Sequence, residues 1–346
     1  MRAYPSALYA CRLVWAAGLS GLMAFAGQAL ARGSAVANWP ERTIKLIVPF
    51  PPGGINDAVA RPVADKLKDL LGTVVIENRG GAGGTIGATA AARSDPDGYT
   101  ILFGSGATHI VGPAITPTKT YDPVKDFKAV AILTVSGLGI AVHPGLGVHS
   151  LQELIAHARQ NPGKLSYGSA GVGSATHLGA ELFKSLINDQ SIVHVPYKGG
   201  GPAMGDLVSG QIRLAVLNIS GSMIELHNAG KLRILAVTSQ QRVKSAPQIP
   251  TAIEAGVSDL FAINFSGLFV PAATPAPIIA RISQAATTMM ADAKLVKLFE
   301  DAGLQIAAQT TPESAQAFVN DEIVRWTPVI ERIGLAPKQA PAKKSQ

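Results

Sequence analysis

The 346-residue chain contains only one cysteine, Cys11, which precedes the main body of the sequence. A disulfide needs a second cysteine, so the chain cannot form one internally, and beyond Cys11 it has no thiol for catalysis. Charged residues make up only 15% and aromatic residues only 5% of the chain, whereas it has 36 glycines and 23 prolines. This composition is typical of an α/β protein with many short connections rather than a helical bundle or a disordered chain.

The motifs of several enzyme classes are also missing. The sequence after Ala37 has no G-x-S-x-G nucleophile elbow, no P-loop pattern and no H-E-x-x-H zinc pattern. The seven histidines show no metal-ligand spacing. The glycine cluster at 80–84 fails the dinucleotide pattern, because the sixth position counted from Gly81 is Ile86. We therefore expect no catalytic residue, no metal and no cofactor.

Long hydrophobic runs are limited to one, near the start of the chain. Arg2 and Arg12 precede an apolar run at 13–30, which ends in Ala29-Leu30-Ala31, and Ala35-Val36-Ala37 offers a second small-residue site. These features predict a secretory signal peptide over residues 1–37, cleaved after Ala31 or Ala37. A membrane anchor is the alternative, which the small residues within the run disfavour.

The positive charge is concentrated at the two ends of the chain. Removing residues 1–37 takes away three arginines and no acid, so the net charge falls from +7 to 7 − 3 = +4. Three further lysines lie in a Pro/Ala/Lys tail at 336–346. The remainder is nearly balanced, so the sequence gives no reason to expect a nucleic-acid partner.

One stretch near residue 50 combines a strand, a glycine turn and a helix start. Residues 44–48 form an apolar strand, 49–54 read Pro-Phe-Pro-Pro-Gly-Gly, and a helical pattern then ends at Gly72. Such a turn can cradle an anion, because main-chain N–H groups and the helix dipole face the ligand. The same order recurs at 165–186, around the glycine loop 168–177. The alternative for either loop is an ordinary tight turn.

The remaining pattern predicts an α/β fold with two lobes. Further strands are expected at 74–77, 99–103, 165–167, 192–196, 212–217, 232–237 and 261–270, and 130–142 is expected to form two strands separated by Ser136-Gly137. C-terminal helices are expected at 275–291, at 292–302 and from 311. The predicted domains are lobe one at 38–137 plus 268–335, lobe two at 138–267, and a flexible basic tail at 336–346. Loops at the carboxyl ends of the strands would then line a ligand cleft between the lobes.

The loops at these strand ends, 49–57, 104–109, 169–177 and 197–202, contain few charges. Asp57 and Lys198 are the only formal charges, while hydroxyl and amide side chains are common. These hydroxyl and amide groups suit the reversible binding of a carboxylate through hydrogen bonds and helix N-termini. Asp57 can equally be a first-turn acid that offsets the helix dipole. His177 and His109 can equally be capping or packing residues, and Lys198 a solvated loop lysine.

A series of motifs resembles a known family. They are Trp39-Pro40-Glu41-Arg42, Ile47-Val48-Pro49-Phe50-Pro51-Pro52-Gly53-Gly54, Glu77-Asn78-Arg79 with Gly81-Ala82-Gly83-Gly84, Asp95-Pro96-Asp97-Gly98-Tyr99-Thr100, His194-Val195-Pro196-Tyr197-Lys198-Gly199, and Gly230-Lys231-Leu232-Arg233 with Leu235-Ala236-Val237-Thr238. In this order, over residues 39 to about 335, the chain resembles the Bug family of periplasmic solute-binding proteins of tripartite tricarboxylate transporters.

The resemblance implies a two-lobed, periplasmic-binding-protein-like fold of type II, often called a Venus flytrap. It implies a periplasmic protein, expected to be a monomer, that captures a small carboxylate and delivers it to the membrane permease subunits. A sensor kinase is an alternative partner, and a secreted hydrolase or isomerase using the same cleft is an alternative function. The predicted ligand-binding residues are Phe50, Pro52, Gly53, Gly54, Asn56, Asp57, Ser105, Thr108, Ser169, Ala170, Gly171, Ser174, Thr176, His177, Tyr197 and Asn218.

Three positions depart from the family pattern. Asn56 replaces a frequent hydroxyl residue before Asp57, Leu217 replaces an acidic residue before Asn218, and Asn264-Phe265-Ser266 stands where an aromatic residue is often found. All three lie where ligand identity is expected to be decided. The sequence therefore leaves the particular carboxylate open.

Overall fold

The computed structural model describes residues 38–53, 55–307 and 311–336. Residue contacts divide the chain into two units, residues 1–42 and 43–346. The described part of the first unit, residues 38–42, contains no helix or strand. The predicted signal peptide, Gly54 and the tail from residue 337 onward lie outside the described residues, and the fold below is that of the second unit.

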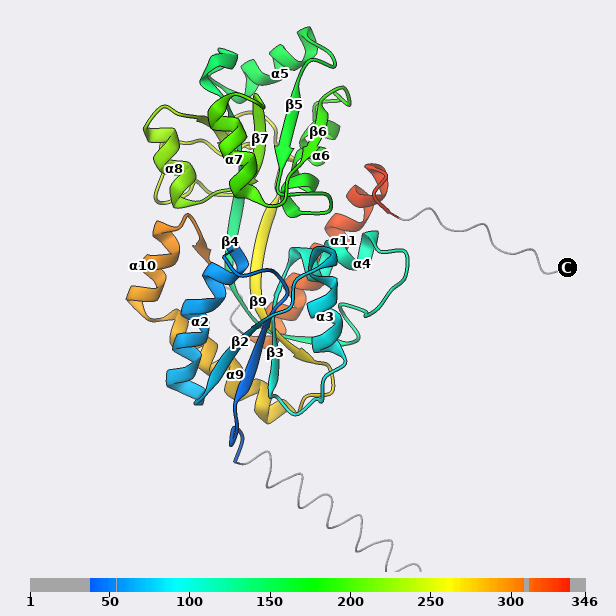
Figure 1. The fold of residues 1–346 in the computed structure, drawn as a ribbon, viewed down its shortest axis with the longest axis vertical. Coiled ribbons are helices and arrows are strands. Elements are labelled where there is room, and N and C mark those ends of the chain that lie inside the picture. Colours follow the sequence, from blue (N-terminus) through cyan, green and yellow to red (C-terminus); the bar gives the residue numbers. More distant parts are fainter. Residues whose placement is uncertain (1–37, 54, 308–310, 337–346) are drawn as a thin grey trace, which may run out of the picture. The chain divides into compact units, whose positions relative to one another are not determined.

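The described elements alternate between strands and helices (Figure 1). The strands are β1 (Ile44–Val48), β2 (Val74–Asn78), β3 (Thr100–Ser105), β4 (Phe127–Val142), β5 (Ser166–Ser169), β6 (Val193–Pro196), β7 (Leu214–Asn218), β8 (Arg233–Val237), β9 (Ile263–Pro271) and β10 (Gln305–Ile306). The α-helices are α2 (Ile55–Leu71), α3 (Thr85–Ala92), α4 (Gly112–Ile115), α5 (Leu151–Gln160), α6 (Ala175–Leu186), α7 (Gly200–Ser209), α8 (Gly221–Asn228), α9 (Ala276–Met290), α10 (Ala293–Asp301) and α11 (Pro312–Arg332). Short helical segments are η1 (Ala82–Gly84), η2 (Ala107–Val111) and η3 (Pro144–Leu146).

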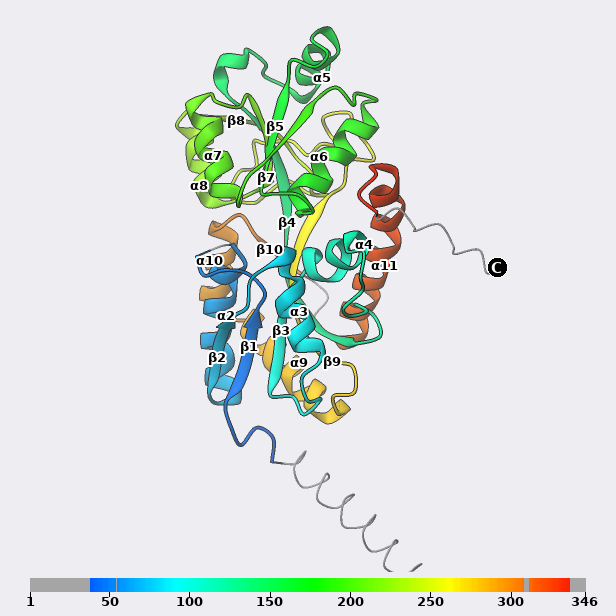
Figure 2. The same ribbon diagram turned by 45° about the vertical axis from the view of Figure 1, so that its right-hand side comes forward.

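The sheet consists of two parallel parts joined by antiparallel strands. Its order is β2-β1-β3-β9-β4-β7-β5-β6, with β8 and β10 each paired to β4. Strands β2, β1 and β3 are parallel, as are β6, β5 and β7. Strands β4 and β9 run between the two parts, and helices α5 to α8 lie around the part that contains β5 to β7 (Figures 1 and 2). The carboxyl ends of the parallel strands therefore lead into the predicted binding loops.

Strand β4 corrects one sequence prediction. The break expected at Ser136-Gly137 is wrong, because Phe127–Val142 is one strand of 16 residues. Its first part pairs with β9 up to Gly137, and its last part pairs with β7 and β8 from residue 138 onward. Gly137 serves a close approach instead of a turn, since a Cβ there would lie only 2.8 Å from Oγ of Ser239. The strand therefore belongs to both parts of the sheet.

Local sequence explains how the main helices begin and end. In α2, Val59, Val63 and Leu67 recur at helical spacing and are buried. Gly72 ends the helix in the left-handed region at φ 83°, and its N–H donates to the carbonyl of Lys68. Ser150 caps α5, Ser174 caps α6 and Thr311 caps α11, each through its side-chain oxygen.

The apolar core lies on both faces of the sheet. In β7, Leu214 and Val216 belong to one buried cluster, whereas Ala215 and Leu217 belong to another. Helices cover both faces of such a strand, which explains why it reads as a continuous apolar run. The C-terminal helices α9 and α11 pack against β4, and α9 also packs against α2. These contacts agree with a lobe one completed by C-terminal residues, while the lobe boundaries themselves stay a prediction.

One predicted loop and one helix differ from expectation. Residues 104–109 were expected to be a loop, but Gly104 and Ser105 end β3, and Ala107–Val111 form the π-helix η2. Helix α8 was not predicted, because Gly221 and Ser222 begin it and mask its short apolar pattern. The two strand, glycine-loop and helix units, β1–α2 and β5–α6, are confirmed.

Candidate functional site

The loop after β1 is organised by Asp57, in the first turn of α2. Its side chain is 2% exposed, and its Oδ2 accepts from the N–H of Gly53 at 2.9 Å and from Nε of Arg61 at 2.9 Å. Burial raises the pKa of Asp57, but the hydrogen bonds from Gly53, Asn78 and Arg61 outweigh it and lower the pKa below its usual value. Both oxygens are thus engaged within the protein, so Asp57 acts as an anchor of the loop.

Asn78, at the end of β2, holds the same loop from the other side. Its Nδ2 donates to Oδ1 of Asp57 at 2.9 Å and to the carbonyl of Phe50 at 3.1 Å. Asn78 belongs to one of the family motifs, but the sequence predicts no role for it. Its position directly after a strand that neighbours β1 was the signal that could have found it.

Two predicted residues lie at the carboxyl end of β3. Thr108 is fully buried, and its Oγ1 accepts from the N–H of Ser105 at 2.9 Å and donates to the Ser105 carbonyl at 3.0 Å. Ser105 is 1% exposed, and its own Oγ has no hydrogen-bond partner among the described residues. A Cβ on Gly84 would meet the side chains of both Thr108 and Phe50, so the β1 and β3 loops lie together.

His109 is a packing residue. Its ring is 1% exposed and stacks on Phe269, with ring centroids 3.7 Å apart. Burial lowers the pKa of His109 to about 3. These contacts agree with the packing role that is the alternative prediction for His109.

In the second half of the sheet, the loop after β5 is folded on itself by hydrogen bonds. The N–H of Ala170 donates to Oγ1 of Thr176 at 2.9 Å, and the N–H of Gly171 donates to Oγ of Ser169 at 3.1 Å. Oγ of Ser174 donates to the carbonyl of Gly171 at 2.7 Å. Five predicted residues are therefore brought together here, and two of their amides already have internal acceptors.

Three stacked aromatic rings support this loop. His194 of β6 lies between Tyr167 of β5, at 4.8 Å, and His177 of α6, at 4.1 Å, measured between ring centroids. Nε2 of His194 lies 2.7 Å from Oγ of Ser169, and Nδ1 of His177 accepts from the N–H of Gly173 at 3.2 Å. Burial and the neighbouring His194 lower the pKa of His177 to about 4, and burial also lowers the pKa of His194. Both imidazoles are therefore neutral at pH 7 and act on the loop as hydrogen-bonding groups.

Tyr197 and Asn218 complete the predicted set. The hydroxyl of Tyr197 donates to Oδ2 of Asp206 on α7 at 2.7 Å, and burial together with this carboxylate raises the pKa of Tyr197 to about 12. Asn218 ends β7, and its buried Oδ1 has no hydrogen-bond partner in the described part of the chain. Asn218 thus resembles Ser105: each places an unused polar atom at the carboxyl end of a strand.

The strand register relates the positions of these two residues in the sheet. Asn218 pairs with Leu138 of β4, and Ser105 pairs with Ser266 of β9, which in turn pairs with Thr134 of β4. Thr134 and Leu138 are four residues apart, about 13 Å along a strand. Strands β3 and β7 are also separated by β9 and β4, which adds about 14 Å across the sheet.

The loops of the two halves also touch. A Cβ on Gly173 would lie 2.6 Å from Cδ1 of Ile115 and 3.5 Å from Cγ1 of Val111. Gly173 belongs to the loop after β5, whereas Ile115 and Val111 follow β3. The predicted site residues are therefore brought together in two groups, one on each side of this contact. Pro52 and Gly53 are exposed at the edge of the first group, and Asn56 is half-buried.

The site offers hydroxyl, amide and imidazole groups but few charges. Across residues 38–53, 55–307 and 311–336, no group of three or more His, Cys, Asp or Glu side chains could hold a metal ion. Within the same ranges, no helix has both the length and the apolar character needed to cross a membrane. The chemistry that the described site supports is reversible hydrogen bonding of a small polar molecule.

Comparisons with known proteins agree with this fold. Residues 59–335 match the family described as the tripartite tricarboxylate transporter family receptor. The chain is 35% identical to BugT of Bordetella pertussis over 298 residues, which cover 86% of this chain and 90% of BugT. An R. palustris protein solved with adipate is 33% identical at a TM-score of 0.79, over 87% of this chain and 100% of that one. MatC from Rhodopseudomonas palustris, solved with malate, is 32% identical at a TM-score of 0.75, over 84% of this chain and 100% of MatC.

The fold is therefore that of a two-lobed α/β periplasmic binding protein, which confirms the predicted fold class. The chain belongs to the Bug family of tripartite tricarboxylate transporter receptors. It is a solute-binding protein of that transport system.

Proposed function

We propose that the protein captures a small organic carboxylate in the periplasm, after removal of its signal peptide, and delivers it to the permease subunits of a tripartite transporter without chemical change. The proteins solved with adipate and malate, each about one-third identical to this chain, support a carboxylate as the ligand class. The near absence of charge at the site supports recognition by hydrogen bonds and helix N-termini.

The observation that carries the proposal is the pair of unused buried atoms, Oγ of Ser105 and Oδ1 of Asn218. Leaving a buried polar group unpaired costs about 1–3 kcal/mol, so such atoms need a reason. They end β3 and β7, at the strand ends where open α/β sheets bind ligands. A bound ligand that pairs with either atom would remove the cost of leaving that atom unpaired.

The proposed binding residues are drawn from the set predicted from the sequence, with Ala175 added and the roles redistributed. The amides of Gly53, Ala170 and Gly171 donate to internal acceptors, which favours other donors for the ligand. The first-turn amides of α6, at Ala175 and Thr176, have no acceptor within the helix. We assign the direct contacts to these amides, to Ser105 and to Asn218, and a supporting role to Asp57 and Tyr197.

One contact could favour an enzyme instead. Oγ of Ser169 and Nε2 of His194 are 2.7 Å apart, which is a typical distance between a catalytic nucleophile and its base. However, Ser169 is completely buried, and its Oγ also accepts from the N–H of Gly171. The pair is better explained as a support of the loop. Incubation of the protein with each bound acid should yield no product, and turnover that Ser169→Ala abolishes would contradict the proposal.

The test compares Ser105→Ala with a matched control. Wild-type protein lacking residues 1–37 should be stabilised by one or a few compounds in a thermal-shift screen of carboxylates. Ser105→Ala should weaken that binding at least tenfold while leaving the ligand-free protein as stable or more stable, because the unpaired hydroxyl is gone. Thr274→Val removes another buried unpaired hydroxyl, beyond β9, so it should raise stability without changing binding. Equal affinity of the wild type and Ser105→Ala would refute the site.

A further inference from the structure

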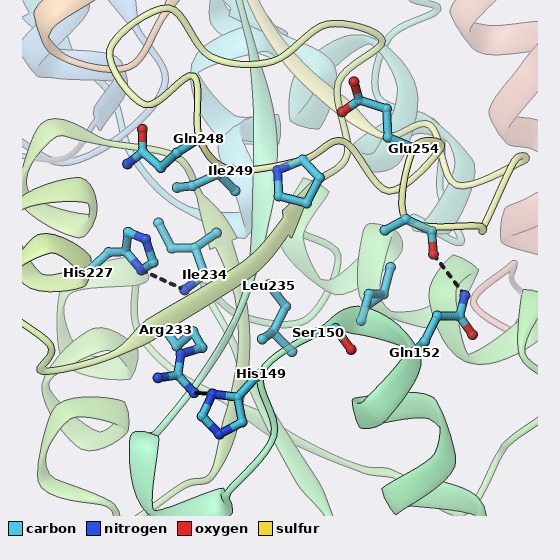
Figure 3. A pocket seen from close by; sticks show the side chains of 13 residues that line it. His149, Ser150, Gln152, His227, Arg233, Ile234, Leu235, Gln248, Ile249 and Glu254 are labelled. Atoms are coloured by element: carbon cyan, nitrogen blue, oxygen red, sulfur yellow. Dashed lines mark hydrogen bonds between the residues drawn. The ribbon is translucent and has the colours of Figure 1, made fainter.

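A pocket lies in the half of the fold that holds α5, α8 and β8. It has a volume of about 440 Å³, within the range of small-molecule sites. Its lining combines basic and polar side chains with an apolar floor (Figure 3). The lining residues are His149, Ser150, Leu151, Gln152, His227, Arg233, Ile234, Leu235, Gln248, Ile249, Pro250, Glu254 and Ala255.

This pocket is separate from the carboxylate site. None of its lining residues belongs to the predicted binding set. Arg233 pairs with Val142 at the end of β4, whereas Asn218 pairs with Leu138. These positions on β4 are four residues, about 13 Å, apart, and Arg233 belongs to β8, whereas Asn218 belongs to β7.

Arg233 provides a positive charge that no acid neutralises. Its Nη1 donates to the carbonyl of Val148 at 3.1 Å and to Nδ1 of His149 at 2.5 Å. Among the ion pairs of the described residues, none involves Arg233. Its Nε and Nη2 therefore remain as charged donors beside the pocket.

Two histidines add further donors, and their hydrogen bonds determine the tautomers. An arginine can only donate, so Nδ1 of His149 is an acceptor and the neutral ring carries its proton on Nε2. Nδ1 of His227 accepts from the N–H of Ile234 at 3.2 Å, so His227 likewise carries its proton on Nε2. The pocket is thus lined by three basic side chains that carry N–H donors, and these side chains lie toward one side of it in Figure 3.

The single acid of the pocket does not oppose this charge. Glu254 accepts from Nε of Arg242 at 2.8 Å and from the N–H of Thr251 at 2.7 Å, and these contacts lower the pKa of Glu254. In Figure 3 it lies on the opposite side of the pocket from Arg233. Between them, Leu235 and Ile249 are buried and form an apolar surface.

We propose that this pocket is a second ligand site, which binds a small organic monoanion through Arg233, His149 and His227 and covers its apolar body with Leu235 and Ile249. The donor set matches an oxyanion, and the apolar floor favours an organic acid over inorganic phosphate. This site is independent of the carboxylate that the protein transports, so either proposal can fail without the other.

The test uses benzoate, its neutral analogue benzamide, and inorganic phosphate as probes for the protein lacking residues 1–37. Binding is followed by amide chemical shifts, which separate this pocket from the site at Ser105 and Asn218. Benzoate should shift the amides of residues 149–152 and 233–235, with benzamide and phosphate at least fivefold weaker. Arg233→Gln should weaken benzoate binding at least tenfold, whereas Lys231→Gln, which removes the same charge two residues away, should change it less than twofold.

A second variant controls for structural damage in Arg233→Gln, because Arg233 also donates a hydrogen bond to the carbonyl of Val148. Gln248 is exposed at the rim, and Gln248→Glu adds a negative charge to the pocket without removing Arg233. It should weaken benzoate binding at least threefold at unchanged melting temperature. Equal binding of benzoate and benzamide, equal effects of the Arg233 and Lys231 variants, or no shifts at 10 mM benzoate would overturn the proposal. Phosphate binding as strong as that of benzoate would also overturn it, because an organic acid would not be preferred.

Discussion

His177 and His194 stack face to face beneath the loop after β5, with their ring centroids 4.1 Å apart and their planes inclined by 13°. Each ring also contacts the loop, His177 through the N–H of Gly173 and His194 through Oγ of Ser169. The charged groups beside this pair are Glu181 and Lys184, which form an ion pair at 2.8 Å. Burial and the neighbouring imidazole disfavour a proton on His177 and outweigh Glu181, which favours it, and Lys184 also disfavours it.

This arrangement predicts a loss of stability in mild acid. The pKa of His177 is about 4 in the folded chain, whereas in the unfolded chain it is near 6.5. Between these values the unfolded state binds more protons, so the free energy of unfolding falls as the pH is lowered from about 6.5 to 4, by at most about 3 kcal/mol. Urea unfolding at pH 7, 6, 5 and 4 measures this slope.

The variant His177→Asn tests the assignment. An asparagine oxygen can still accept from the N–H of Gly173, but it does not titrate, so the slope between pH 6.5 and 4 should become shallower. His157→Asn, on α5 and outside the three stacked rings, should leave the slope as in the wild type. An unchanged slope in His177→Asn would mean that other groups cause the acid sensitivity.

A second prediction concerns the anchor of the first loop. Asp57→Asn should lower the free energy of unfolding by about 2–3 kcal/mol, because hydrogen bonds to a buried charged group are lost. The pKa of Asp57 is lowered on folding, so the wild-type contribution is present above its usual pKa and is lost as the pH falls through the lowered value. Asp65→Asn, on the exposed side of the same helix, should change stability by less than 0.5 kcal/mol. Chemical unfolding at pH 7 distinguishes them, and equal effects would contradict the anchoring role.

A third prediction concerns Gly171 and Gly53, which both lie in predicted binding loops but differ in their surroundings. Gly171 has φ 126°, and a Cβ there would lie 2.9 Å from the carbonyl oxygen of Tyr197. Gly53 has φ 81°, but a Cβ would meet nothing within 4 Å. Gly171→Ala should therefore cost about 1–3 kcal/mol and disturb ligand binding, whereas Gly53→Asn should fold almost normally, since asparagine tolerates the left-handed region. Titration calorimetry with the best carboxylate checks both, and normal binding by Gly171→Ala would show that this loop does not contact the ligand.

A fourth prediction follows from Asn218 and refines the ligand class. A carboxylate oxygen cannot donate to Oδ1 of Asn218, whose partner must carry a hydrogen. Malate should therefore bind more tightly than succinate, because its hydroxyl can donate, and Asn218→Leu should remove this preference by weakening malate binding. Competition between the two acids in wild type and variant measures the effect. A preference for succinate would indicate that the amide presents its nitrogen to the ligand instead.

The sequence correctly predicted the repeated units of strand, glycine loop and helix, but it did not predict contacts between residues that are far apart in the chain. The units β1–α2 and β5–α6 carry strong local signals, because apolar periodicity, glycine turns and caps agree over both. The break predicted in β4 was wrong because Gly137 was interpreted as a turn residue, whereas it allows the close approach of Ser239, about 100 residues later. Nothing local in the sequence indicates that contact.

In the candidate site as well, the local patterns were predicted and the long-range contacts were not. Its loops were found from strand–glycine–helix patterns, and Asp57 was already considered a first-turn acid. The supporting roles of Asn78 and His194 were not found, since both depend on which strands become neighbours. The unused atoms of Ser105 and Asn218 could be recognised only from burial, which spacing alone does not provide.

The length of β4 also affects how the chain is assembled during synthesis. Strand β9 lies between β3 and β4 in the sheet, yet Ile263 is made 263 − 142 = 121 residues after β4 ends at Val142. A nascent chain that stops before Ile263 can build β1 to β3 and much of the other half, but it has no strand to join β3 to β4. Such long-range pairing is slow, because a large loop must close before any contact is gained. The protein can therefore first bind a ligand only after β9 has been synthesised, although the binding loops are made earlier.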